Sequence, residues 1–303
     1  MADVPSLALK NFSLPMKQER HHVQKATEES PAINTRAEER KVEDRLAIGP
    51  NIVYETIRRE GEEEFKRTSA ALAWSGLAAG LSMGFSLVAE ALLAAHLPHA
   101  SWTPLISKLG YSVGFLIVIL GRQQLFTETT LTIILPLLTK RTWSKILNGL
   151  RIWIVILTAN LVGTLIFAFC IGRMVFFDPS IRQALTDVSQ EGAGGSFVTA
   201  LVRGVFAGWL IALTVWLLPS ADSSRISIII ILTYLIGLGG FNHVIAGSTK
   251  MFYLIVTGGE TWNAYVAQFL VPTLLGNILG GVSLVAFLGH AQIVAGKHSP
   301  SDG

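Results

Sequence analysis

Long apolar stretches alternate with short polar segments from about residue 69 to residue 294. A helix needs about 20 predominantly apolar residues to cross the hydrocarbon core of a bilayer. Six stretches reach that length, and each predicts a membrane-spanning helix. They cover residues 69–97, 105–138, 146–171, 198–218, 226–257 and 264–294.

The second and the fifth stretch are interrupted by polar residues near their middle. The second breaks at Gly121-Arg122-Gln123-Gln124, and the fifth breaks at Asn242-His243 and again at residues 247–250. Each apolar piece alone is too short to cross the membrane. Non-helical backbone at that depth is tolerated only where it is buried in protein or lines a water-filled cavity. We therefore expect both breaks to lie inside the protein.

The six spans divide into two halves of three, with the broken span in the middle of each half. An odd number of spans per half means that the second half inserts upside down relative to the first. Matching breaks in inverted halves indicate a binding or conduction site near the middle of the membrane. The prediction is an all-α membrane protein with six transmembrane helices, an inverted repeat and two broken helices, the second and the fifth.

The composition supports this fold class and excludes other functions. Charged residues make up 15% of the chain, whereas soluble domains average about 25%. The net charge of +3 is spread thinly, and no basic stripe predicts a nucleic-acid partner. The sequence contains neither a cofactor motif nor a His-Glu-x-x-His run nor a paired nucleophile and base. We expect no cofactor, no metal and no enzymatic activity.

Charged residues are concentrated before residue 67. We expect a polar, partly disordered cytoplasmic tail over residues 1–66, a pore domain over residues 67–295, and a short cytoplasmic tail over residues 296–303. Within the first tail, residues 53–65 predict an amphipathic helix, which we expect to be a solvated linker. Cationic residues in short loops favour the cytoplasmic side, and their placement predicts that both termini are cytoplasmic. These residues are Arg58, Arg59, Lys66, Arg67, Lys140, Arg141, Lys145 and Arg225.

Five short motifs resemble the formate/nitrite transporter family. The run Leu125-Phe126-Thr127 after the first break resembles the Leu-Phe-Thr of the family's loop between two half-helices. At the second break, Phe241-Asn242-His243 resembles the family's Phe-Glu-His. The other three are Asn160-Leu161-Val162-Gly163, Arg203-Gly204-Val205-Phe206-Ala207-Gly208-Trp209 and Pro272-Thr273-Leu274-Leu275-Gly276-Asn277-Ile278-Leu279-Gly280-Gly281. The resemblance covers residues 69–288.

This resemblance implies an aquaporin-like protomer in a bacterial inner membrane, assembled as a homopentamer with one pore per protomer. The family's cargo is small monovalent anions such as formate, nitrite, acetate, lactate or hydrosulfide. In the family, apolar constrictions surround a central His that hydrogen-bonds the loop Thr. Asn242 stands where the family has Glu, and Gly208 stands where it has Asn, which indicates a divergent branch. The expected pore residues are Leu125, Phe126, Thr127, Asn160, Phe241, Asn242, His243 and Asn277.

A pore for anions must supply hydrogen-bond donors, the positive ends of helices, or a proton. We expect half-helices that begin near residues 127–130 and 248–251 to direct free N–H groups inward. Burial favours the neutral imidazole of His243, which can donate a hydrogen bond. The hypothesis is a channel or proton-linked transporter that a weak acid crosses in its neutral form. The alternative for His243 is a hydrogen-bonded packing residue.

Glu128 and Lys250 are ionisable residues within apolar spans. Such residues cost at least ~2.5–3.5 kcal/mol at the bilayer centre on insertion scales, and they usually pair or face water. We expect these two at roughly equivalent places of the repeats, either paired or flanking the pore, with Lys250 attracting anions. The alternative is that both reach the membrane interface. Arg122 is a further candidate for attracting anions, and Glu90 is expected at the outer interface.

Two other functions are compatible with the same architecture. One is a pore for water or a neutral solute, although the Asn-Pro-Ala signatures of aquaporins are absent at both breaks. The other is a non-conducting membrane scaffold, in which packed side chains close the pore.

Overall fold

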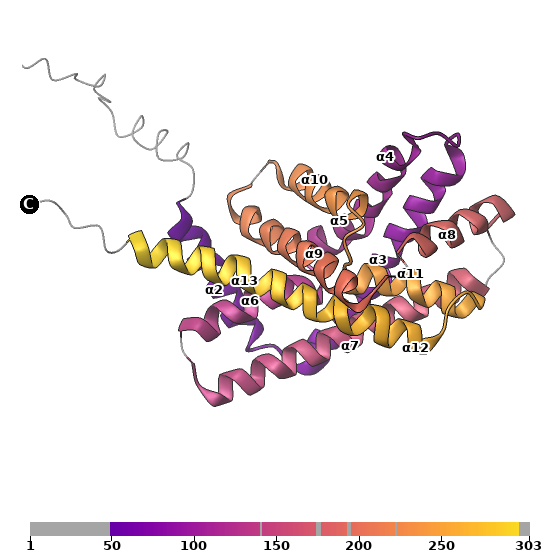
Figure 1. Ribbon diagram of the computed structural model, residues 1–303. Coiled ribbons are helices and arrows are strands. Elements are labelled where there is room, and N and C mark those ends of the chain that lie inside the picture. The colour runs from indigo at the N-terminus through magenta and orange to yellow at the C-terminus, as the bar shows by residue number, and fades with distance from the viewer. Residues whose placement is uncertain (1–48, 140, 174–176, 193–194, 222, 297–303) are drawn as a thin grey trace, which may run out of the picture. The chain divides into compact units, whose positions relative to one another are not determined.

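The computed structural model describes residues 49–139, 141–173, 177–192, 195–221 and 223–296, with side chains described as far as residue 283. The chain divides into two units, Met1–Leu46 and Ala47–Gly303. The predicted tail up to residue 48 and residues 297–303 lie outside the described residues. The described part of the second unit contains helices and no strand, as Figure 1 shows.

The first half of the predicted repeat contains two long helices and a broken one. The long helices are α3 (Ser69–His96) and α7 (Trp143–Arg173). Between them, α4 (Thr103–Ser107), the 3₁₀ helix η1 (Lys108–Tyr111) and α5 (Ser112–Leu120) form one run, and α6 (Phe126–Thr139) follows after a gap. The predicted break in the second span is confirmed.

The second half repeats this arrangement. Its long helices are α9 (Phe197–Leu217), which ends in the short 3₁₀ helix η2 (Leu218–Ser220), and α13 (Val271–Gly296). Helix α13 is preceded by α12 (Trp262–Ala264) and a π-helical turn η3 (Tyr265–Leu270). The broken member consists of α10 (Arg225–Leu238) and α11 (Val244–Thr257). The predicted start of the second half-helix near residue 248 is wrong, because α11 begins four residues earlier.

Within the part of the chain that the structure describes, five helical runs are long and apolar enough to cross a membrane. They are Ser69–His96, Thr103–Leu120, Trp143–Arg173, Phe197–Ser220 and Trp262–Ser283. The fifth predicted span is represented by α10 and α11, each of which has 14 residues and is too short to cross alone. The chain is a multi-pass membrane protein with the predicted all-α architecture.

The two breaks have the same backbone turn. Arg122 has φ of 49° and Gly240 has φ of 61°. These residues are 118 positions apart, which is also the separation between the first residues of α6 and α11, Phe126 and Val244. A left-handed conformation is uncommon for any residue except glycine. The matching turns therefore support a structural repeat rather than two unrelated loops.

Glycines bring the long helices of each half together. A Cβ atom on Gly80 of α3 would lie 2.2 Å from the carbonyl oxygen of Asn160 in α7. In the second half, a Cβ atom on Gly208 of α9 would lie 2.2 Å from the carbonyl oxygen of Asn277 in α13. Only glycine fits at such a separation. The small residues thus serve close packing within the bundle.

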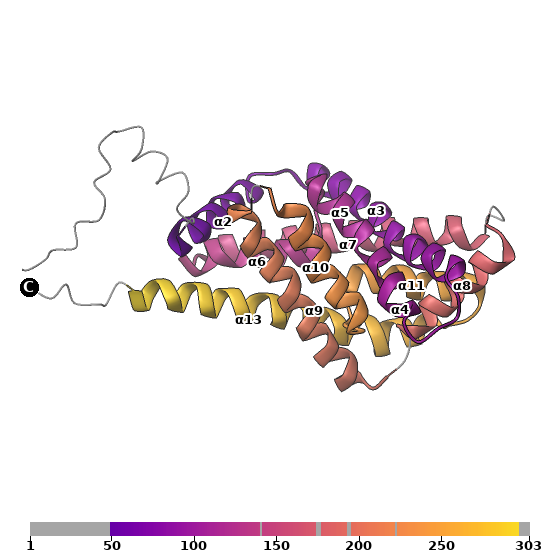
Figure 2. The same ribbon diagram turned by 90° about the horizontal axis from the view of Figure 1, so that it is seen from above.

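Two further helices pack against the bundle. The predicted amphipathic segment forms α2 (Pro50–Glu64), and it is not a solvated linker, because Val53 and Ile57 are buried where α2 packs on α6. Helix α8 (Pro179–Glu191) lies between the third and fourth spans and packs on α3 and α11. In Figures 1 and 2, α2 and α6 lie at one end of the bundle, and α4 and α8 lie at the other.

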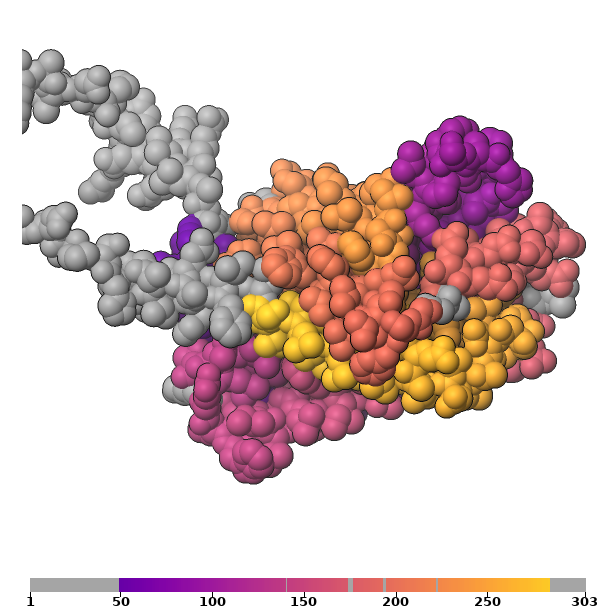
Figure 3. Space-filling view, in the orientation of Figure 1, coloured from indigo at the N-terminus to yellow at the C-terminus, as the bar shows by residue number. Residues whose placement is uncertain are grey.

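Large apolar side chains cover much of the surface of the long helices. They include Leu150, Ile154 and Phe169 of α7 and Val198, Val202 and Phe206 of α9. Figure 3 shows α9, α10 and α13 side by side on one face, with α7 beneath them. Continuous exposed apolar surface of this kind is suited to lipid or to another subunit and not to water.

Candidate functional site

Two buried asparagines hold the broken ends in place. The Asn160 side chain of α7 accepts a hydrogen bond from the Phe126 N–H (2.9 Å) and donates to the carbonyl oxygens of Gly76 (2.7 Å) and Gln124 (2.9 Å). The first residue of α6 would otherwise leave its amide unpaired. Asn160 therefore joins α3, the first break and α7.

Asn277 makes the equivalent bonds in the second half. Its side chain accepts from the Val244 N–H (2.8 Å) and donates to the carbonyl oxygens of Gly204 (2.9 Å) and Asn242 (2.8 Å). Both asparagines are at most 1% exposed. The structure thus assigns them an anchoring position, whereas sequence analysis expected them to be pore or substrate residues.

The two breaks meet at a single side-chain contact. Thr127 Oγ1 of the first half lies 2.7 Å from His243 Nε2 of the second half, and both residues are buried. His243 is also the N-cap of α11, because its Nδ1 accepts a hydrogen bond from the Ala246 N–H at 3.2 Å. A nitrogen that accepts carries no hydrogen, so a neutral ring has its proton on Nε2 and donates it to Thr127.

Apolar and aromatic side chains surround this contact. Leu125 and Phe126 are each 1% exposed. The Phe115 ring of α5 meets the His243 ring edge to face at 4.9 Å, a contact that the sequence motifs did not predict. Phe241 stacks on Phe206 of α9 at 5.1 Å.

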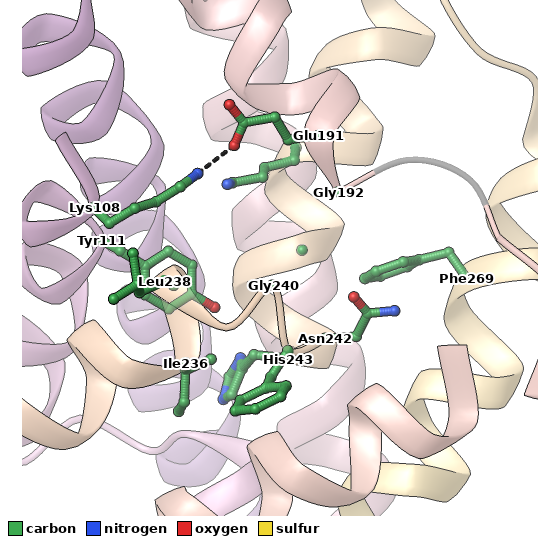
Figure 4. A pocket seen from close by; sticks show the side chains of 14 residues that line it. Lys108, Tyr111, Glu191, Gly192, Ile236, Leu238, Gly240, Asn242, His243 and Phe269 are labelled. Atoms are coloured by element: carbon green, nitrogen blue, oxygen red, sulfur yellow. Dashed lines mark hydrogen bonds and ion pairs between the residues drawn. The ribbon is translucent and has the colours of Figure 1, made fainter. Parts of the chain in front are cut away.

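Two hollows approach the contact from different ends of α10. The α8-side pocket, about 140 Å³, is lined by Tyr111, Phe241, Asn242, His243 and residues near the end of α10. The α2-side cavity, about 520 Å³, is lined by Leu125, Glu128 and Arg225 at the start of α10. Figure 4 shows the α8-side pocket, with His243 and Asn242 below Glu191 and Lys108.

The predicted pair of Glu128 and Lys250 does not form. Lys250 Nζ lies 3.0 Å from Glu90 Oε2 and lines the α8-side pocket. Glu128 lines the α2-side cavity, and its buried Oε1 has no hydrogen-bond partner among the described residues. Their places in the two repeats differ by about one helical turn. With a repeat spacing of 118 residues, Glu128 corresponds to Ala246.

Glu90 is not at the interface that the sequence predicted. Its side chain is fully buried and binds both Lys250 and Lys108. Lys108 also contacts Glu191 at the end of α8. Sequence analysis missed Lys108 and Glu191, although a lysine inside an apolar span was a signal for the first. Among the residues with described side chains, no three His, Cys, Asp or Glu residues gather as metal ligands.

Arg122 lies at the first break, exposed, and lines the α2-side cavity. Asn242 lies at the second break and lines the α8-side pocket with its side chain, while its backbone binds Asn277. The structure therefore distributes the predicted site residues among the contact itself, its two approaches and the anchors that hold it.

Comparison with known proteins agrees with this geometry. The sequence profile described as formate/nitrite transporter matches residues 51–291. "Inner membrane protein YfdC" of Escherichia coli (strain K12) is 40% identical over 251 residues, which is 83% of this chain and 81% of the relative. "Formate channel BtFdhC" of Bacillus thuringiensis is 28% identical over 247 residues, covering 78% of this chain and 93% of the relative.

Two solved structures share the fold. A "pentameric formate channel with formate bound" superposes with a TM-score of 0.62 at 21% identity, covering 75% of this chain and 98% of the channel. An "FNT family ion channel" gives a TM-score of 0.64 at 20% identity and covers 83% and 98%. The profile match spans most of the chain, including both breaks, so this protein belongs to the formate/nitrite transporter family, whose members are membrane transporters and not enzymes.

Proposed function

We propose that this protein conducts small monovalent anions or their weak acids, with formate the first to test. The path runs from the α8-side pocket, past the contact between Thr127 and His243, into the α2-side cavity. The observation that carries the proposal is the 2.7 Å contact between these two residues, one from each break. A bond between the two broken ends at the middle of an inverted repeat is where such folds place their conduction site.

The chemistry of the contact suits a weak acid. The His243 Nε2–H and the Thr127 hydroxyl supply polar groups in surroundings that are otherwise apolar. A bare anion loses its hydration there, and a neutral acid loses far less. We propose that Leu125, Phe126 and Phe241 restrict the path to small cargo. The cargo crosses as the protonated acid, which links transport to protons.

The names of the relatives support the choice of substrate. One relative is a formate channel, and one structural neighbour holds formate. Because that neighbour is pentameric, we propose a homopentamer with a pore in each protomer. The exposed apolar faces of α7 and α9 would then contact lipid or neighbouring subunits. We place α2 and both termini on the cytoplasmic side of a bacterial inner membrane, following the cationic loops.

The test uses the purified full chain in liposomes. Uptake of labelled formate, nitrite, acetate and lactate is measured at about pH 5 and about pH 7.5, on either side of the histidine range. We expect faster uptake of formate at the acidic pH. His243→Gln should lower it by about tenfold, which corresponds to one buried hydrogen bond of 1–3 kcal/mol. Uptake equal to that of empty liposomes at both pH values would overturn the proposal.

A matched control is available in His96. This residue is exposed at the end of α3, where its ring contacts only the Leu92 carbonyl among the described hydrogen bonds. His96→Gln removes the same functional group outside the proposed path and should leave uptake unchanged. Thr127→Val tests the other partner and should reduce uptake as His243→Gln does.

One observation favours a second candidate, a closed scaffold, and the same assay also tests the alternative of a pore for neutral solutes. Leu125, Phe126, Thr127 and His243 are each at most 2% exposed, so packed side chains fill the space between the two hollows. A scaffold gives no flux of any solute in the same liposomes. A neutral-solute pore gives osmotic water flow or glycerol uptake without anion uptake.

A further inference from the structure

Four charged side chains form a cluster beside the α8-side pocket, and three of them, Lys108, Glu191 and Lys250, line it. Glu90 of α3 is at the centre of the cluster, with one carboxylate oxygen on Lys108 and the other 3.0 Å from Lys250 Nζ. Lys108 binds a second carboxylate, that of Glu191, as the dashed line in Figure 4 shows. Lys250 also lies over the Tyr111 ring, 5.6 Å from its centroid. Four separate helical elements thus contribute to one cluster.

The two carboxylates differ in how firmly the fold encloses them. The Glu90 side chain is 0% exposed, whereas that of Glu191 is 56% exposed. Glu191 is also the last residue of α8, and a negative charge is unfavourable at a helix C-terminus. The charge of its carboxylate is therefore stabilised by Lys108 and not by its own helix. Of the two carboxylates, Glu191 is the one that another anion can replace.

Charge balance explains why an anion is needed at this place. Glu90 alone neutralises one of the two lysines, so the cluster without Glu191 has one excess positive charge. Both lysines are only 11% exposed, and charge at such a site is screened weakly by water. A carboxylate beside Lys108 restores neutrality. Formate offers the same carboxylate group as Glu191, without the tether.

The cluster lies on the proposed path, in the same pocket as His243. Lys250 follows His243 by seven residues in α11, which puts both on the same face, about 10 Å apart along the axis. Lys108, Lys250 and His243 all line the α8-side pocket. An anion bound at the two lysines would therefore lie in the same pocket as His243, which makes the contact between the two breaks.

We propose that Lys108 and Lys250 form an entrance site for a small carboxylate, and that Glu191 occupies this site as a tethered competitor which the incoming anion displaces. The inference rests on the proposed function, because it takes the pocket as the entrance of the path. A tethered group has an effective concentration on the order of millimolar. Glu191 therefore makes the entrance respond to anion concentrations in that range and keeps it neutral when anion is scarce.

The experiment combines binding and transport. Equilibrium binding of labelled formate to the purified full chain in detergent is measured beside uptake into liposomes. Glu191→Gln keeps the shape and removes the competing charge, and it should tighten formate binding by about three- to tenfold, as the loss of a millimolar competitor predicts. Asp187→Asn is the matched control, since Asp187 is exposed on the same helix and contacts Gln183. It should bind as the unchanged chain does.

A second variant tests the lysine. Lys108→Met combined with Glu191→Gln should abolish the gain in binding, with folding checked by size-exclusion profile and thermal unfolding. If Glu191 only fastens α8 to the bundle, Glu191→Gln lowers the unfolding temperature and leaves formate affinity unchanged, which overturns the inference. Unchanged affinity together with normal uptake rejects the entrance site and leaves the proposed function intact. Tighter binding without uptake in any variant rejects the proposed function and supports the site.

Discussion

Asn160 and Asn277 make the same three hydrogen bonds in the two halves of the molecule. Each accepts from the first amide of a half-helix and donates to a carbonyl in the preceding break and to a glycine carbonyl in the partner helix. Two segments of different sequence are thereby held in the same geometry. The contact between Thr127 and His243 depends on both anchors, because each anchor fixes the start of one half-helix.

Replacement of either anchor by leucine should destabilise the fold. Asn160→Leu removes the side-chain partner of the Phe126 amide and of the Gln124 carbonyl at the first break, and each unsatisfied buried group costs about 1–3 kcal/mol. Asn277→Leu removes the equivalent bonds, so the two variants should lower the thermal unfolding temperature by similar amounts. Asn148→Leu is the control, since Asn148 donates one long bond of 3.3 Å to the Phe65 carbonyl. Unfolding of Asn160→Leu at the unchanged temperature would contradict the anchoring role.

The close glycine contacts predict a second symmetric effect. Gly80→Ala and Gly208→Ala each place a methyl group 2.2 Å from a backbone oxygen, so the paired helices must separate. Overpacking of this kind typically costs about 1–3 kcal/mol. Gly49→Ala meets no atom within 4 Å and serves as the control. The thermal unfolding temperature of all three variants is measured in detergent. Equal temperatures for Gly80→Ala and Gly49→Ala would show that the paired helices move apart without loss of stability.

Arg122 combines an unfavourable backbone conformation with a place in the α2-side cavity. Its φ of 49° is left-handed, while the matching residue Gly240 adopts this conformation without strain. Arg122→Gly should therefore raise stability by about 1 kcal/mol, the lower end for such strain. If the guanidinium attracts anions, formate uptake should fall in the same variant. Arg122→Lys keeps the cation and the strained conformation, and it should keep uptake without any gain in stability.

Phe126 tests the restriction to small cargo. Its ring is buried and meets the Trp153 ring edge to face at 6.0 Å. Phe126→Leu should raise lactate uptake relative to formate uptake, at a stability cost below about 3 kcal/mol. Phe169→Leu changes a ring that is 56% exposed on α7 and should not alter the ratio. An unchanged ratio in Phe126→Leu would remove this side chain from the restriction.

The sequence by itself determined the membrane class, the repeat and the position of both breaks. The length of each span follows from its apolar run, and polar residues such as Arg122 and His243 interrupt two of these runs. The pattern of apolar and polar residues along the chain was therefore sufficient to predict the spans and the breaks. The motif resemblance also indicated the family. Only the tertiary structure decided which charged residues meet. Glu90 binds Lys250, 160 residues away, and does not lie at an interface, whereas the described residues offer no partner for the buried Oε1 of Glu128. Pairing across helices depends on helix rotation and on the exact start of each half-helix, and a shift of four residues at α11 was enough to misplace Lys250.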